Sequence, residues 1–150
     1  MATKDLGEKI YECTYDSIIT HKNDGNGHLP YEKYPDYTRP IRDSFLRSFG
    51  WSDESFGLMG LSFVVKNHGT DNKVEMHEGD RFKMKLEVFA SARVKLFMVY
   101  TYLDYQGENA LAVGTSKCCF TRRGSRNPIL TPKFFLDTIK TSSASSSQTS

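Results

Sequence analysis

No apolar run in the 150-residue sequence approaches the roughly 18 residues that a membrane-spanning helix needs. The first twelve residues, MATKDLGEKIYE, also lack the apolar stretch of a secretory signal. Because both features are missing, we expect a cytoplasmic protein that has no membrane partner.

Cysteines are few, and no metal-binding spacing occurs. The three cysteines, Cys13, Cys118 and Cys119, are odd in number and lack the spacing of a disulfide framework. Since neighbouring residues of a strand point to opposite faces, we expect the adjacent pair to be ordinary half-buried residues. The four histidines show no His-x-x-x-His spacing, and there is no Cys-x-x-Cys pair. We therefore expect neither a metal nor a cofactor.

The charge balance does not indicate a nucleic-acid-binding protein either. The sequence has 20 basic and 18 acidic residues, a net charge of +2, which is too balanced to favour a nucleic-acid partner. Aromatic residues, in contrast, are abundant at 13%, with ten Phe and eight Tyr. They could form an aromatic core or a pocket for an apolar ligand, and composition leaves both possibilities open.

The first predicted elements are a strand and a helix. Residues 9–20, KIYECTYDSIIT, are rich in β-branched and aromatic side chains and predict a strand. Over residues 30–49 an aromatic or aliphatic side chain recurs every three or four positions, which predicts a single apolar helical stripe. Pro40 within this segment predicts one bent helix or two short ones, and Gly50 is expected to cap the helix end.

The rest of the chain predicts an antiparallel sheet. Residues 61–66 predict a strand, and residues 67–80 contain loop-forming residues on either side of a possible short strand. Residues 81–90 alternate apolar with charged side chains, as in a strand that buries one face. Residues 93–103 and 110–122 flank the polar turn DYQGEN and predict a hairpin. A sheet with one helix packed on one face accounts for this order, which indicates an α+β fold.

The length of the chain is typical of a single domain. The final stretch, TSSASSSQTS, holds no large apolar side chain that could join a core. We therefore expect a domain over residues 1–139 and a disordered Ser-rich tail over residues 140–150.

Four residues at the predicted junction between strand and helix have a specific spacing. Asp24 and Gly27 form an Asp-x-x-Gly pair, Tyr34 follows ten residues after the aspartate, and Arg42 follows eight residues later. This spacing, followed by a strand meander, resembles that of acyl-CoA thioesterases of the 4-hydroxybenzoyl-CoA thioesterase family. The resemblance covers about residues 9–136. It implies one hotdog domain, an antiparallel sheet wrapped around one long helix.

The resemblance also implies how the reaction would proceed. Asp24 would be the catalytic carboxylate, either as nucleophile or as general base on water. A thioester needs little more than this carboxylate and donors for the oxyanion, because its thiolate leaves with a conjugate-acid pKa of about 8.5. Backbone N–H groups at the helix start would be those donors. The substrate-binding residues implied by the resemblance in this segment are Gly27, His28, Leu29, Tyr31 and Tyr34.

Cations are needed if the substrate is coenzyme A, because its phosphates must be held. The resemblance assigns this role to Arg93 and Lys95, between two predicted strands, while Arg122, Arg123 and Arg126 form a second candidate group. Ordinary surface charge is the alternative for each of them. The thioester could equally be carried by acyl carrier protein.

Several alternatives stay open from the sequence. Asp24 could simply form a turn or cap a helix. Lys33 and Pro40 depart from the family's pattern, which keeps a non-catalytic acyl-binding protein possible. An enoyl-CoA hydratase or dehydratase is a further alternative, although Asp24 and His28 are one residue too close for the Asp-x-x-x-x-His pattern. An open sheet edge and an incomplete pocket predict a homodimer or a homotetramer.

Overall fold

The computed structural model describes residues 6–18, 35–72, 76–77, 79–91 and 93–149. Three helices and six strands make up this part of the chain. In chain order they are β1 (Glu8–Ile18), α1 (Pro35–Ser48), α2 (Asp53–Leu58), β2 (Leu61–Asn72), β3 (Arg81–Ser91), β4 (Lys95–Leu103), β5 (Ala110–Arg122), β6 (Pro128–Ile129) and α3 (Lys133–Thr149).

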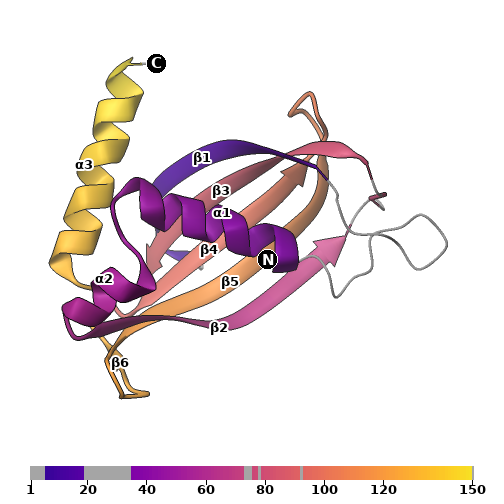
Figure 1. Cartoon of the computed structure of the whole chain (residues 1–150). Coiled ribbons are helices and arrows are strands. Elements are labelled where there is room, and N and C mark those ends of the chain that lie inside the picture. The colour runs from indigo at the N-terminus through magenta and orange to yellow at the C-terminus, as the bar shows by residue number, and fades with distance from the viewer. Residues whose placement is uncertain (1–5, 19–34, 73–75, 78, 92, 150) are drawn as a thin grey trace.

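The strands form one antiparallel sheet in the order β1-β3-β4-β5-β2, and the short β6 pairs with β5. Strands β1 and β2 are therefore the two edges of the main sheet. Figure 1 shows α1 lying across one face of the sheet. Helix α3 lies beside β1, whose first residue, Glu8, pairs with Lys140 of α3. This arrangement confirms the predicted α+β class.

Strand β3 shows how the sheet buries the face that lies under α1. Its apolar residues, spaced two apart, point toward α1 and are fully buried: Phe82, Met84, Leu86 and Val88. The alternating charged residues point to the other face, as a side-chain period of two requires. The predicted strand over 81–90 is thus confirmed, and so is the hairpin of β4 and β5.

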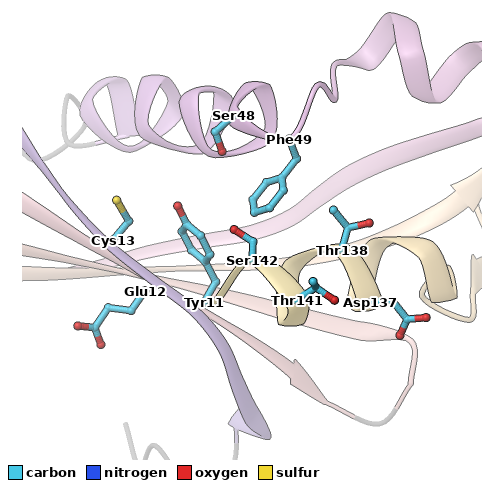
Figure 2. A pocket seen from close by; sticks show the side chains of 9 residues that line it. All are labelled: Tyr11, Glu12, Cys13, Ser48, Phe49, Asp137, Thr138, Thr141 and Ser142. Atoms are coloured by element: carbon cyan, nitrogen blue, oxygen red, sulfur yellow. The ribbon is translucent and has the colours of Figure 1, made fainter. Parts of the chain in front are cut away.

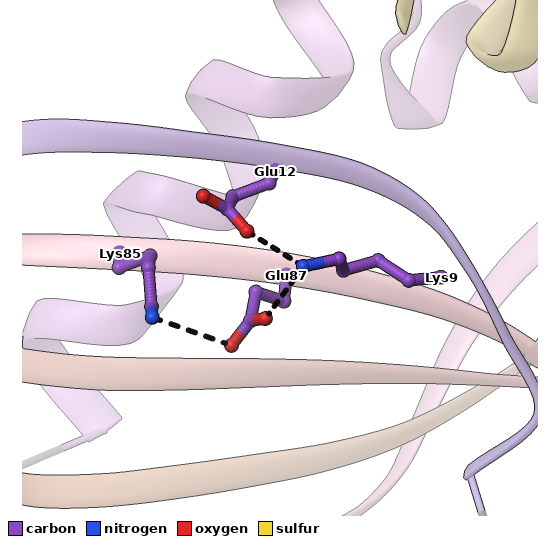
Figure 3. A network of polar contacts seen from close by, with 4 residues as sticks. All are labelled: Lys9, Glu12, Lys85 and Glu87. Carbon is purple, nitrogen blue, oxygen red and sulfur yellow. Dashed lines mark hydrogen bonds and ion pairs between the residues drawn. The ribbon is translucent and has the colours of Figure 1, made fainter. Parts of the chain in front are cut away.

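The outer face of β1 and β3 carries a network of ion pairs (Figure 3). The Nζ atom of Lys9 lies 2.8 Å from Oε1 of Glu12 and 3.2 Å from Oε2 of Glu87. Lys85 approaches the other oxygen of Glu87 at 4.0 Å. Exposed pairs of this kind contribute only about 0–1 kcal/mol each, so their main effect is to keep this face solvated.

Helix α1 buries the stripe that the sequence predicts. Tyr37, Ile41 and Phe45 face the core, and Pro40 lies on the exposed side. One helical element covers Pro35–Ser48 with the proline inside it, so the alternative of two short helices within this span is not found.

The end of α1 is closed by Gly50, as predicted. This glycine has a φ of 79°, which favours a residue without a Cβ. Its N–H donates to the carbonyl of Arg47 at 2.9 Å, and the N–H of Trp51 donates to that of Leu46 at 3.0 Å. The two bonds form a Schellman motif. They fix the direction in which the chain leaves the helix.

Two elements near the helix differ from the prediction. Helix α2 was not predicted, although Ser52 and Ser55 form a reciprocal capping box at its start. Strand β2 continues to Asn72, well beyond residue 66, because its polar second half pairs with β5. Tertiary pairing therefore overrides local loop-forming residues there.

The two adjacent cysteines are more buried than predicted. Cys118 is 1% exposed and Cys119 is 4% exposed, so both faces of β5 are covered at this point. The expectation that they would be half-buried was wrong, because sequence alternation gives the face of a side chain but not what covers that face.

Helix α3 continues past the domain end that we expected at residue 139. Phe135 and Ile139 anchor it in the core, and Lys140 pairs with Glu8 of β1 at 3.1 Å. Residues 140–142 therefore contact the domain, and the helical backbone reaches Thr149. The disorder expected of the Ser-rich tail stays a prediction.

Candidate functional site

Most of the residues assigned to the site from sequence lie outside the described part of the chain. These are Asp24, Gly27, His28, Leu29, Tyr31 and Tyr34. The described residues on either side still locate the segment by its ends, since Ile18 ends β1 and Pro35 begins α1. The segment that carries Asp24 thus connects the end of an edge strand to the start of the helix on the sheet.

Arg93 and Lys95 lie at the other end of the sheet. Ile18 pairs with Arg81, the first residue of β3, whereas Arg93 follows the last residue of that strand. The 11 residues of β3 span about 33 Å at the usual rise of a strand. Both cations are exposed, and the carbonyl of Arg93 accepts from the N–H of Thr131 at 2.7 Å. The two cations therefore lie at the opposite end of β3 from Ile18, the last described residue before the segment that carries Asp24.

Arg42, the last residue of the four-point spacing, turns toward the sheet. Its Nη1 atom lies 3.3 Å from the phenol oxygen of Tyr100 on β4, and this hydroxyl in turn lies 3.4 Å from the sulfur of Met98. Tyr100 is fully buried, which raises the pKa of its phenol, although the Arg42 guanidinium opposes the rise. The contact joins the middle of α1 to the centre of the sheet.

Two further polar residues lie near this contact, on β5. Burial raises the pKa of the Cys118 thiol to about 12, with Arg42 again opposing the rise. The Ser116 hydroxyl is among the groups that lower the pKa of Tyr100. Among the described residues, the Oγ atom of Ser116 forms no hydrogen bond of good geometry. At neutral pH the Cys118 thiol therefore stays protonated.

A groove of about 480 Å³ runs between α1, α2 and β2, and we call it the α1 groove. Arginines of α1 line one side, and aromatic and aliphatic side chains form its floor. Such a combination can hold an amphipathic anion, because guanidinium groups bind phosphate or carboxylate while the floor binds an apolar chain. The lining residues are Arg39, Arg42, Asp43, Leu46, Arg47, Trp51, Ser52, Asp53, Phe56, Phe63 and Val65.

Sequence reasoning missed most of this groove. A signal was present, because Arg39, Asp43 and Arg47 follow one another at a spacing of four and so share a helix face. The floor could not have been found this way, since Phe63 lies on β2 and reaches the groove only through the sheet topology. The groove also holds two carboxylates, those of Asp43 and Asp53.

A second cavity of about 700 Å³ lies between β1, the end of α1 and α3 (Figure 2). Its lining combines hydroxyl groups and the Cys13 thiol with the rings of Tyr11 and Phe49 and the carboxylates of Glu12 and Asp137. Burial is the main cause that raises the pKa of the Tyr11 phenol, and it raises that of the neighbouring Tyr15 as well. Both phenols therefore stay protonated at neutral pH.

Across the residues that the structure covers, no group of three or more His, Cys, Asp or Glu side chains could hold a metal ion. The described helices also include none that is long and apolar enough to span a membrane.

Comparison with known families identifies the class of protein. Residues 19–139 match the Thioesterase-like superfamily, which is most of the chain. The chain therefore belongs to this superfamily. The match begins just after β1 and includes the segment with Asp24, the helix α1 and the strands that follow.

Individual relatives agree with this classification. The "Putative esterase" of Aquifex aeolicus (strain VF5) is 26% identical over 120 residues, covering 80% of this chain and 91% of that protein. A hypothetical protein of Aquifex aeolicus has a crystal structure with a TM-score of 0.73 at 24% identity, covering 85% of this chain and 99% of that one. The 1,4-dihydroxy-2-naphthoyl-CoA thioesterase of Synechocystis has a TM-score of 0.76 at 16% identity, covering 87% and 96% of the two chains.

These likenesses confirm the hotdog fold that the resemblance implied. Membership of a thioesterase-like superfamily supports hydrolysis of thioesters as the general reaction.

Proposed function

We propose that the chain hydrolyses acyl-CoA thioesters in the manner of the 4-hydroxybenzoyl-CoA thioesterase family. The observation that carries the proposal is the superfamily match over residues 19–139, which includes both Asp24 and α1. A solved structure of the same fold is a thioesterase of a coenzyme A ester, 1,4-dihydroxy-2-naphthoyl-CoA. The α1 groove adds support, because its arginines and apolar floor suit an amphipathic anion.

In the proposed reaction, Asp24 attacks the thioester carbonyl or removes a proton from the water that attacks it. On either route a C–O bond forms, the C–S bond breaks and the thiol is released. If Asp24 is the nucleophile, water then hydrolyses the acyl-aspartate anhydride, which releases the carboxylic acid and regenerates Asp24. If Asp24 is the general base, the attacking water gives the carboxylic acid directly. Backbone N–H groups of His28, Leu29 or Tyr31 would hold the oxyanion. Tyr31 and Tyr34 would bind the acyl group.

The contact of Arg42 with Tyr100 has a role in this proposal. A catalytic segment works only if its support is held within about 0.5 Å of the productive geometry. The segment with Asp24 leads directly into α1, and the guanidinium of Arg42 ties that helix to the buried phenol of β4. Arg42 would thus act as a positioning residue.

The proposal includes a homodimer or homotetramer in the cytoplasm. Among the described strands, β2 pairs only with β5, so its outer edge is available to a second copy. A second subunit would also be required for Arg93 and Lys95 to reach the coenzyme A bound at another chain's α1. Sedimentation of a stable 17.1 kDa monomer at micromolar concentration would contradict this part.

The decisive experiment is a panel of short, long and aromatic acyl-CoAs with detection of the released thiol. The proposal expects turnover on at least one class. Saturable binding without thiol release would instead show a non-catalytic acyl-binding protein. The departures from the family's pattern at Lys33 and Pro40 would then accompany the absence of catalysis. Turnover of an enoyl-CoA or a 3-hydroxyacyl-CoA without thiol release would indicate a hydratase or dehydratase.

A further inference from the structure

The two ends of the sheet carry opposite charge. At the end where β1 finishes and β3 begins, the described side chains include five acids and two cations: Asp16, Asp71, Asp80, Asp104, Glu108, Arg81 and Lys83. At the opposite end the turn after β5 and the start of α3 carry four cations: Arg122, Arg123, Arg126 and Lys133. The sequence from residue 109 to residue 136 contains no acidic residue at all.

This second end, which we call the basic end, also exposes apolar side chains. Leu58 is 85% exposed, Leu130 is 61% exposed and Met59 is 48% exposed. Each of them lies in or beside a turn: Leu58 ends α2, Met59 lies between α2 and β2, and Leu130 lies between β6 and α3. Single exposed leucines are ordinary on protein surfaces, but several on neighbouring turns within a cationic region are unusual.

Backbone contacts hold these turns side by side. The N–H of Arg123 donates to the carbonyl of Gly60 at 2.8 Å, and its guanidinium donates to the carbonyl of Asp53 at 3.1 Å. That guanidinium lies against Gly57, where a Cβ atom would collide with it. Figure 1 shows α2, β6 and the start of α3 together at this end of the molecule. The cations and the apolar tips therefore belong to one surface.

We propose that the basic end docks on an anionic lipid surface. Lipid headgroups of negative charge attract lysine and arginine, while leucine and methionine at turn tips can enter the boundary between headgroups and acyl chains. Acids are also present at this end: Asp53 and Glu54 lie in the first turn of α2, whereas Leu58 is its last residue.

The lack of a membrane-spanning run and of a secretory signal led us to expect no membrane partner, and this proposal revises that expectation. A net charge of +2 describes the whole chain and does not show how the charge is distributed. An acidic protein could also meet a cationic surface. The exposed leucines favour lipid, because they would have to be matched by an equally apolar patch on such a protein.

Sedimentation of the full chain with lipid vesicles tests the proposal without any substrate. We expect binding to vesicles of equal parts phosphatidylcholine and phosphatidylglycerol but not to phosphatidylcholine alone. Binding should weaken as salt rises, since the Debye length falls from about 30 Å at 0.01 M to about 8 Å at 0.15 M. Equal binding to both vesicles, or none to either, would overturn the proposal.

The variants separate the contributions of charge and of apolar side chains. Replacing Arg122, Arg126 and Lys133 with Gln should lower partition into anionic vesicles by at least about tenfold, because each cation near such a surface contributes on the order of fivefold. Arg123 is left in place because it supports α2. Leu58→Ser should lower partition on the order of tenfold if the leucine enters the bilayer boundary. A matched control removes three cations elsewhere, Lys66, Arg81 and Lys117, and should bind like wild type.

Equal losses in the triple variant and its control would show a general charge effect and overturn the assignment to the basic end. Immobilised polyglutamate provides the remaining comparison. Polyglutamate could retain the chain as strongly as the vesicles do, and Leu58→Ser could leave both polyglutamate retention and vesicle binding unchanged. In that case the partner is an acidic protein and the lipid proposal is wrong. Thiol release from a soluble acyl-CoA is measured separately. If the chain binds vesicles but hydrolyses no acyl-CoA, only the proposed function is contradicted, and the lipid proposal stands.

Discussion

The Nη1 atom of Arg42 lies 3.3 Å from the phenol oxygen of Tyr100 at the centre of the sheet. Arg42 itself is partly buried, at the boundary between the exposed and the buried side of α1. The tyrosine is fully buried, so its hydroxyl has lost its water and depends on protein partners. The arginine lies in the α1 groove as well. A single side chain thus joins the proposed binding surface to the core of the domain.

This contact predicts a measurable coupling between the helix and the sheet. Tyr100→Phe should reduce the free energy of unfolding by about 1.5–3 kcal/mol, the usual range for a hydrogen bond to a charged group. A double-mutant cycle with Arg42→Met, followed by urea unfolding, should give a coupling energy of about 0.5–3 kcal/mol. Arg39→Met on the exposed side of the same helix is the matched control. Additive losses in the Arg42 cycle would show that the contact contributes nothing to stability.

Burial of Cys118 predicts how stability changes at alkaline pH. The thiol pKa rises from 9.0 to about 12 in the folded chain, so the folded state holds its proton more tightly than the unfolded state. The stabilisation is therefore complete below pH 9 and is lost as the pH rises from 9 toward 12. Urea unfolding should show that Cys118→Ala has a weaker pH dependence over this window than wild type.

The quantity to compare is the slope of the free energy of unfolding against pH. The absolute free energy is not comparable, because removing the sulfur also leaves a small cavity. Tyr100 is present in both proteins, and burial, the main cause that raises its pKa, acts in the same direction in each. At neutral pH the half-buried Cys13 should react with a thiol reagent while the native Cys118 does not. Parallel slopes in the two proteins would contradict the prediction.

The cations of the β3–β4 turn give a prediction about the substrate. If Arg93 and Lys95 bind the phosphates of coenzyme A, replacing both with Ala should raise KM for an acyl-CoA. The same variant should hardly change KM for a short thioester that lacks the nucleotide. The KM effect should also shrink as salt rises, since both side chains are exposed. Equal losses on the two substrates would count against the assignment.

The parts of the fold that could be predicted from sequence are those set by side-chain periodicity. The alternation of Phe82, Met84, Leu86 and Val88 predicted the buried face of β3, and the three-to-four spacing of apolar residues predicted the buried stripe of α1. Gly50 was recognisable as a cap because a left-handed residue is needed where a helix ends. These features depend only on neighbours in the sequence.

The parts that could not be predicted depend on distant neighbours. The polar second half of β2 is a strand only because β5 pairs with it. Cys119 is buried only because other parts of the protein cover the second face of the sheet at this point. The α1 groove and the basic end likewise form from segments that are far apart in the sequence. The spacing of Asp24, Tyr34 and Arg42 did indicate the superfamily, but it could not show that Arg42 reaches Tyr100.

The sharpest prediction concerns Asp24. Under the proposed mechanism, Asp24→Asn should lower kcat for thioester hydrolysis by at least about 100-fold, the lower range for losing a general acid–base group. Asparagine is nearly isosteric and also caps turns, so a merely structural Asp24 should tolerate the change at a cost of no more than about 1 kcal/mol. Thiol release at saturating substrate, together with the melting temperature and oligomeric state, separates the two roles.

Asp43→Asn is the matched control for this variant. It makes the same change of carboxylate to amide at an exposed position of the α1 groove, where Asp43 lies among arginines. Because the mechanism needs one carboxylate near the start of α1, the control should keep most of its kcat while Asp24→Asn loses it. A folded Asp24→Asn chain that retained more than about a third of wild-type turnover, far from the 100-fold loss expected of a general base, would end the mechanism. If Asp43→Asn were the inactive variant instead, the catalytic carboxylate would belong to the groove. His28 would be the next residue to test if both variants stayed active.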